Sequence, residues 1–146
     1  MEHYLLIRIL HSAPGVLLLL GLIAHTFMLF KAQRGADAAV LARKLRVTLR
    51  YSVPAFAVLA LSLPLSGFWL VNTAGWPLGQ TWLLLGNILY MVMMLLGLLL
   101  AGRLSAWRAL GDTPAPLGLK RLCLVYAGLI LILLIAIMAL MGAKPA

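Results

Sequence analysis

The sequence predicts an all-α membrane protein, an antiparallel bundle of four transmembrane helices with both termini outside the cytoplasm. Hydrophobic residues make up 64% of the chain and charged residues only 10%, whereas soluble domains average about 25% charged residues. The apolar residues gather in four blocks, and the basic residues gather in two of the segments between them. Composition, block length and charge placement therefore favour the same fold class.

Each apolar block is long enough to cross a bilayer, because a hydrocarbon core of about 30 Å needs about 20 helical residues. None shows the alternation of apolar and polar residues that is typical of a barrel strand. The first block is longer than the roughly 7–15 apolar residues of a signal peptide, so we interpret it as a helix. Together the blocks predict one domain over residues 1–146, with helices at about 4–30, 52–73, 81–103 and 118–142.

Two basic cytoplasmic loops, residues 31–51 and 104–117, are expected to join the first helix to the second and the third to the fourth. In the first loop, Ala36–Arg50 interleaves apolar and basic residues, which is typical of a short amphipathic helix. Such a helix would either lie on anionic lipid headgroups or lengthen the second transmembrane helix into the cytoplasm. Between the second and third helices, Trp76-Pro77-Leu78-Gly79 predicts a tight turn.

The basic residues set the predicted orientation, because cytoplasmic segments of membrane proteins carry an excess of Lys and Arg. Ten of the twelve basic residues lie around the two basic loops, whereas Asn72–Thr81 carries no charge. The ten are Lys31, Arg34, Arg43, Lys44, Arg46, Arg50, Arg103, Arg108, Lys120 and Arg121. The termini and the Asn72–Thr81 turn are therefore expected on the outer side. The net charge of +9 indicates orientation rather than binding to nucleic acid.

Residues that could support catalysis are few. The three acidic residues, Glu2, Asp37 and Asp112, lie outside the predicted spans, so a proton relay through membrane carboxylates is not expected. The chain contains no phosphate-binding loop, dinucleotide fingerprint or zinc-protease motif. The one cysteine, Cys123, excludes an internal disulfide. The remaining candidates for a functional site lie on the first helix.

The first predicted helix carries the polar residues best suited to hold a cofactor. His11 and His25 are 14 residues apart, which places them about 21 Å apart on one helix face. Arg8 lies one turn before His11 on the same face. Ionisable groups in a membrane helix commonly face the bundle interior and mark functional sites. His11 and His25 are therefore candidate metal ligands, and Arg8 is a candidate partner for a carboxylate.

This arrangement suggests haem b, because imidazole is a common axial ligand of haem iron. The two histidines are too far apart to hold one iron, and the other predicted helices contain no histidine. A second ligand would come from Met91, Met93 or Met94, which lie near the bilayer middle at neither histidine's level, or from another subunit. The sequence thus favours one haem, five-coordinate or shared across a homo-oligomer or with a membrane partner, over two.

A purely structural role for the same residues stays open. Near the helix ends the two histidines could bond to interfacial water, a backbone carbonyl or a neighbour such as Tyr126, Cys123 or Asn87. Arg8 could extend to the outer membrane surface. Asn87 and Tyr90 are expected to form hydrogen bonds between helices.

The beginning of the chain resembles a group of small bacterial membrane proteins. Leu10-His11, then Gly21-Leu22 and a basic cytoplasmic exit, are similar to the HemJ type of protoporphyrinogen oxidase and to the CopD copper-resistance domain. The HemJ resemblance implies a haem b ligand at His11, with a basic residue, here Arg8, three positions earlier. Those proteins carry a functional lysine after a tryptophan in helix 3, whereas three leucines and a glycine follow Trp82 in this chain.

A longer resemblance is to a family of predicted four-helix bacterial inner-membrane proteins of unknown function. It rests on the early His11, on Ser66-Gly67-Phe68-Trp69 and on Gly75-Trp76-Pro77-Leu78-Gly79-Gln80-Thr81-Trp82. The resemblance implies a multi-pass protein of the bacterial inner membrane and implies no activity.

Three functional hypotheses follow, and they leave open whether the protein is an enzyme. The first is a haem b-binding redox module that uses His11, with or without His25, and holds Arg8 near a propionate. The second is a non-enzymatic accessory or assembly protein whose polar side chains only join helices. The third is a small transporter, although no charged residue lies at the bilayer midplane. The expected partners are the lipid bilayer and anionic headgroups at the basic loops.

Overall fold

The computed structural model describes residues 2–32, 38–110, 113 and 115–143, and of residues 2, 32, 38, 39, 41 and 42 the backbone alone. Within this part of the chain all regular structure is helical. The elements are α1 (Glu2–Ala32), α2 (Ala38–Val47), the π-helix η1 (Thr48–Ser52), α3 (Val53–Ala74), α4 (Thr81–Ala109) and α5 (Leu117–Ala143). The predicted all-α fold class is confirmed.

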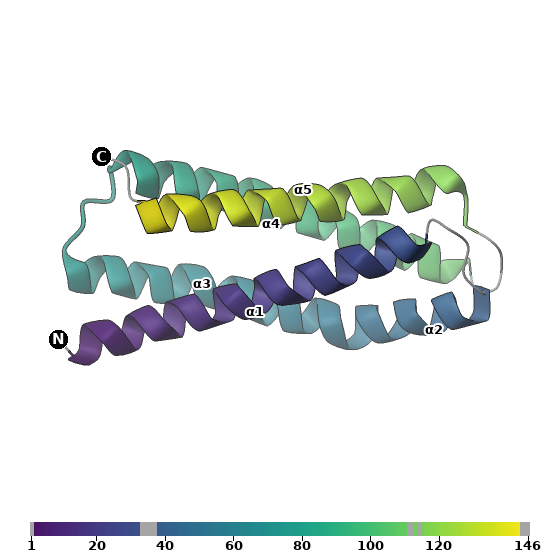
Figure 1. Ribbon diagram of the computed structural model, residues 1–146, viewed down its shortest axis with the longest axis horizontal. Coiled ribbons are helices and arrows are strands. Elements are labelled where there is room, and N and C mark those ends of the chain that lie inside the picture. The colour runs from purple at the N-terminus through teal and green to yellow at the C-terminus, as the bar shows by residue number, and fades with distance from the viewer. Residues whose placement is uncertain (1, 33–37, 111–112, 114, 144–146) are drawn as a thin grey trace.

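Four helices are long and apolar enough to cross a membrane, namely His3–Lys31, Arg43–Ala74, Thr81–Ala109 and Leu117–Ala143. Figure 1 shows that they run back and forth along the long axis of the molecule. The start of α1, the end of α5 and the α3–α4 turn lie at one end, which we name the terminal end. The end of α1, the start of α2, the end of α4 and the start of α5 lie at the opposite end, which we name the basic end. This is the antiparallel four-helix bundle that the sequence predicts.

The four spans form two layers (Figure 1). α1 packs on α3, α4 packs on α5, and α1 also contacts α5 and so ties the layers together. α3 and α4 are consecutive in the chain, yet their backbones make few close contacts, and α4 packs instead on α2 and η1 near the basic end. The bundle is therefore loosely packed between α3 and α4 away from the basic end.

The turn between α3 and α4 depends on a glycine. Gly75 ends α3 with a φ of 74°, in the left-handed region that glycine enters without steric cost. Its N–H donates to the carbonyl of Val71 over 2.9 Å, and the N–H of Trp76 donates to the same oxygen over 3.2 Å. This closure, common at helix C-termini, returns the chain directly into α4.

The segment that we expected as a basic loop, residues 31–51, is largely helical. Residues 38–52 form α2 and η1, and these lead into α3 without a break. Of the two arrangements open for Ala36–Arg50, the structure shows a lengthened second span. Residues 33–37, including Asp37, lie outside the described residues.

Burial explains why this extension is helical. Leu45 is 1% exposed and packs with Leu29, Leu104 and Trp107 at the basic end. The same cluster extends α4 to Ala109, beyond the boundary expected near residue 103. Residues 111, 112 and 114 of the second expected loop, 104–117, lie outside the described residues.

The π-helix η1 lies where α2 joins α3. The N–H of Val53 donates to the carbonyl of Thr48, five residues earlier. Pro54 follows directly and has no N–H to offer the preceding turn. A single π-turn is a recognised way to absorb such a change of register inside a longer helix.

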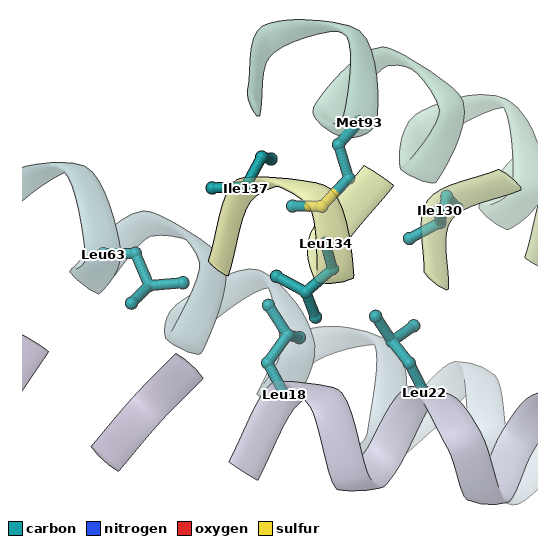
Figure 2. Packing of buried hydrophobic residues seen from close by; sticks show 7 residues of the cluster. All are labelled: Leu18, Leu22, Leu63, Met93, Ile130, Leu134 and Ile137. Carbon is teal, nitrogen blue, oxygen red and sulfur yellow. The ribbon is translucent and has the colours of Figure 1, made fainter. Parts of the chain in front are cut away.

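The central core takes residues from all four spans. Figure 2 shows Leu18 and Leu22 of α1, Leu63 of α3, Met93 of α4 and Leu134 of α5 directed toward one another, with Ile130 and Ile137 beside them. Met93 is only 3% exposed. This core closes the middle of the bundle and separates the terminal end from the basic end.

Candidate functional site

A cavity of about 340 Å³ lies at the terminal end of the bundle, between the α1–α3 and α4–α5 layers. All four spans line it. Its inner wall includes the buried side chains of Leu63, Trp82 and Leu134, whereas Arg8 and Asn87 on its rim are exposed. Its volume falls within the range of about 300–1,000 Å³ that small-molecule sites occupy.

His11 lines this cavity and is held by α3. Its Nδ1 lies 2.9 Å from the hydroxyl oxygen of Ser66. Ser66 donates its hydroxyl proton to the α3 backbone, at 2.8 Å from the Ser62 carbonyl and 3.3 Å from that of Leu63. Because a serine hydroxyl has one proton, His11 must act as the donor through Nδ1. We therefore assign the Nδ1–H tautomer, which leaves the Nε2 lone pair available.

The His11 ring also requires the absence of a side chain at Gly67. A Cβ built at Gly67 would lie 3.1 Å from the His11 Cε1 atom, closer than most Cβ contacts in proteins. Ser66 and Gly67 therefore act together, the first by fixing the ring nitrogen and the second by making room for the ring. Ser66 and Gly67 belong to one of the stretches on which the resemblance to the membrane-protein family rests. The same two residues hold the ring of the early histidine, His11.

Arg8 lines the same cavity, one turn toward the chain start from His11. Its side chain is exposed at the rim. The aromatic rings of Tyr4, Trp76 and Trp82 stand nearby as a cluster, with edge-to-face centroid distances of 6.5 Å for Tyr4–Trp76 and 5.4 Å for Trp76–Trp82. The site therefore combines an imidazole, a cation and an aromatic wall at one level of the bundle.

Four lining residues of α4 and α5 carry an amide, phenol or thioether group that the sequence did not assign to the site. Asn87 was predicted as a possible neighbour of a histidine or as a group that joins helices, and Tyr90 as a group that joins helices. Tyr90 does donate a hydrogen bond to the Ala60 carbonyl of α3. Met138 and Met141 of α5 were not considered. Counting turns from the helix ends at the terminal side places Asn87 and Tyr90 near the level of His11, whereas Met138 and Met141 lie nearer the end of α5.

The side chain of Met141 on α5 lies against Gly86 of α4, and both residues line the cavity. A Cβ at Gly86 would lie 2.8 Å from the Met141 methyl carbon, so the thioether occupies the space that a side chain on α4 would fill. Thioether sulfur is a recognised haem ligand. Met138 and Met141 are therefore the methionines that share a cavity with His11.

The structure does not bring the second histidine to this cavity. His25 packs edge-to-face on Phe56 of α3, with ring centroids 5.3 Å apart. Its Nδ1 and the hydroxyl oxygen of the adjacent Thr26 are buried and have no hydrogen-bond partner within the described residues. Unlike the Nδ1 of His11, the Nδ1 of His25 thus has no bonding partner within the described part of the chain.

The three methionines that the sequence offered as second iron ligands also lie outside the His11 cavity. Met93 belongs to the central core, and Met91 is 69% exposed on the outside of the bundle. Neither residue nor Met94 lines the cavity. Within the described residues, no group of three His, Cys, Asp or Glu side chains converges on one point. His11 is therefore the imidazole around which a site can be built.

Four apolar spans around a largely apolar cavity that a few polar side chains line define an integral membrane protein with a candidate site inside its helical bundle. The family described as "Predicted integral membrane protein (DUF2269)" matches residues 5–145, and the chain belongs to this family. No curated protein and no solved structure matches the chain. The family description states where the protein resides and names no activity.

Proposed function

We propose that this protein is a haem b-binding redox module of the bacterial inner membrane, with His11 as the iron ligand and Arg8 as the partner of a propionate. The observation that carries the proposal is the hydrogen bond from His11 Nδ1 to Ser66, which leaves Nε2 as a ligand atom in a cavity that Arg8 also lines. A ligating histidine characteristically donates its other ring N–H to a fixed acceptor.

The residues of the cavity support this proposal through their chemistry. When bound, haem b would supply a one-electron couple. Ser66 orients the His11 ring, Gly67 makes room for it, and Arg8 offers a guanidinium that pairs well with a carboxylate. The aromatic wall of Trp76 and Trp82 gives apolar surface for a flat macrocycle. Met138 and Met141 offer thioethers at the same cavity.

The geometry supports one haem site in each chain. His25 stands apart from the cavity, so the proposal assigns the ligand role to His11 alone. A thioether of α5 or a group from a second subunit would offer a further ligand to the haem.

The second candidate is an accessory or assembly protein without a cofactor. The same His11–Ser66 bond joins α1 to α3, and the Tyr90–Ala60 bond joins α4 to α3. On this view the polar groups only fix the helices in place, as polar side chains do in many membrane bundles.

Visible spectra separate the two candidates. The protein is purified in mild detergent from cells supplied with a haem precursor, and spectra are recorded oxidised and dithionite-reduced for the wild type, His11→Ala and the matched control His25→Ala. We expect a Soret band in the wild type and in His25→Ala and none in His11→Ala. A colourless wild-type protein, or a Soret band that survives in a folded His11→Ala protein, refutes the haem proposal.

A further inference from the structure

A second hollow lies near the basic end, between α4 and the region where η1 joins α3. This α3–α4 groove has a volume of about 520 Å³ and is separate from the His11 cavity. Both of its walls belong to helices long and apolar enough to span the membrane. Its lining residues are Leu49, Val53, Ala101, Ser105, Arg108 and Ala109.

The groove is apolar except at one end. Leu49, Val53 and Ala101 provide hydrocarbon surface. The hydroxyl of Ser105 donates to the Ala101 carbonyl over 2.9 Å, so its proton is already engaged within α4. Arg108 is therefore the cationic group of the lining, and its side chain is exposed.

A second arginine stands beside the same end. Arg46 is exposed and precedes Leu49 by three residues, which places it one helical turn nearer the basic end on the same side of the helix. The neighbouring Arg50 differs, because its guanidinium lies over the Tyr51 ring at 5.6 Å. No described side chain is a carboxylate, so within the described part of the chain neither Arg46 nor Arg108 has an ion-pair partner.

We propose that the α3–α4 groove seats one anionic phospholipid. Its phosphate lies between Arg108 and Arg46, and an acyl chain covers Leu49, Val53 and Ala101. An anionic phospholipid matches this surface because it offers an anion joined to a long apolar chain at the depth where the spans meet the headgroups. The sequence predicts contacts between the basic segments and anionic lipids, and this proposal gives one such lipid a specific binding site. It does not depend on haem binding at His11.

Lipid titration followed by native mass spectrometry tests the site. The detergent-purified protein is titrated with phosphatidylglycerol and, separately, with phosphatidylcholine of the same chains. We expect one preferred phosphatidylglycerol adduct, weakened about fivefold by Arg108→Gln or Arg46→Gln, the loss expected for one cation near an anionic headgroup. Arg108→Lys keeps the charge and should retain most of the binding.

Two further variants separate a built site from a general charge effect. Arg121 is exposed on α5 and does not line the groove, so Arg121→Gln should leave the adduct unchanged. Ala101→Phe fills the groove without changing any charge and should weaken the adduct as much as Arg108→Gln does. Equal binding of the two lipids, or equal weakening by Arg121→Gln and Arg108→Gln, overturns the proposal. Unchanged binding by a folded Ala101→Phe protein overturns it as well.

Discussion

The hydroxyl group of Tyr90 on α4 donates a hydrogen bond to the backbone carbonyl oxygen of Ala60 on α3. Ala60 lies four residues before Pro64, which has no N–H and therefore cannot bond that carbonyl within the helix. An unsatisfied carbonyl is costly in a bilayer, where water is absent. Tyr90 thus compensates for Pro64, and the bond bridges the side of the bundle where α3 and α4 are otherwise apart.

Replacing Tyr90 by Phe should destabilise the bundle because it leaves the Ala60 carbonyl without a partner. We expect the free energy of unfolding to fall by about 1–3 kcal/mol, the usual cost of a buried polar group that loses its hydrogen bond. Unfolding of the purified protein in mixed micelles with increasing SDS measures the change.

A double-mutant cycle identifies the cause. Pro64→Ala restores an N–H at residue 64, so Ala60 regains its helical partner and Tyr90→Phe should then cost much less than in the wild type. Tyr126→Phe is the matched control on α5. If Tyr90→Phe costs the same with Pro64 as with Ala at that position, the compensation does not exist.

The number of spans, the helical fold and the antiparallel arrangement could be predicted from the sequence because they depend on local properties. Each apolar block is recognisable by its own length, and each short connection forces the next helix to return. The helicity of residues 38–52 was harder to predict, because it depends on Leu45 packing against residues far away in the chain, such as Trp107.

The composition of the site could be predicted only in part, because it depends on which helices meet. The helix-face argument placed Arg8 beside His11, and both residues line the cavity. No periodicity within α1 could show that His11 meets Ser66 whereas His25 meets Phe56. The neighbours of α1 had to be known before Met138 and Met141 could be matched to His11.

Gly67→Ala should disturb His11, because the added Cβ would lie 3.1 Å from the His11 Cε1 atom and the ring is tied to Ser66. The matched control is Gly97→Ala on α4, where a Cβ would meet nothing within 4 Å. We expect Gly67→Ala to be less stable than Gly97→Ala by about 1–3 kcal/mol, the typical cost of overpacking.

The same SDS titration measures this difference, and the Soret band of the haem-loaded protein reports the ring directly. Gly97→Ala should keep the wild-type band, while Gly67→Ala shifts or loses it. Equal stability of the two variants would mean that the His11 ring has room to move.

Ser66→Ala removes the acceptor that fixes His11 Nδ1. The donated hydrogen bond raises the basicity of a ligating imidazole, which stabilises ferric haem, so its loss should raise the midpoint potential and weaken haem retention about 10–100-fold. Ser66→Thr keeps a hydroxyl and should restore wild-type behaviour. Potentiometric titration of the three proteins measures the effect, and identical potentials would exclude Ser66 as a positioning residue.

The orientation of the bundle is the last prediction, and one fused reporter tests much of it. The start of α1, the end of α5 and the α3–α4 turn share one end of the molecule (Figure 1), so all three face the same side of the membrane. The excess of Lys and Arg at the opposite end predicts that this shared side is outside the cytoplasm.

A phosphatase that is active only outside the cytoplasm should therefore work when fused after Ala146 or inserted after Gly79, and should fail when inserted after Thr113. A cytoplasmic fluorescent reporter should give the reverse pattern. Phosphatase activity after Thr113 together with silence after Ala146 would show that the basic segments face outward, and the His11 cavity would then open toward the cytoplasm.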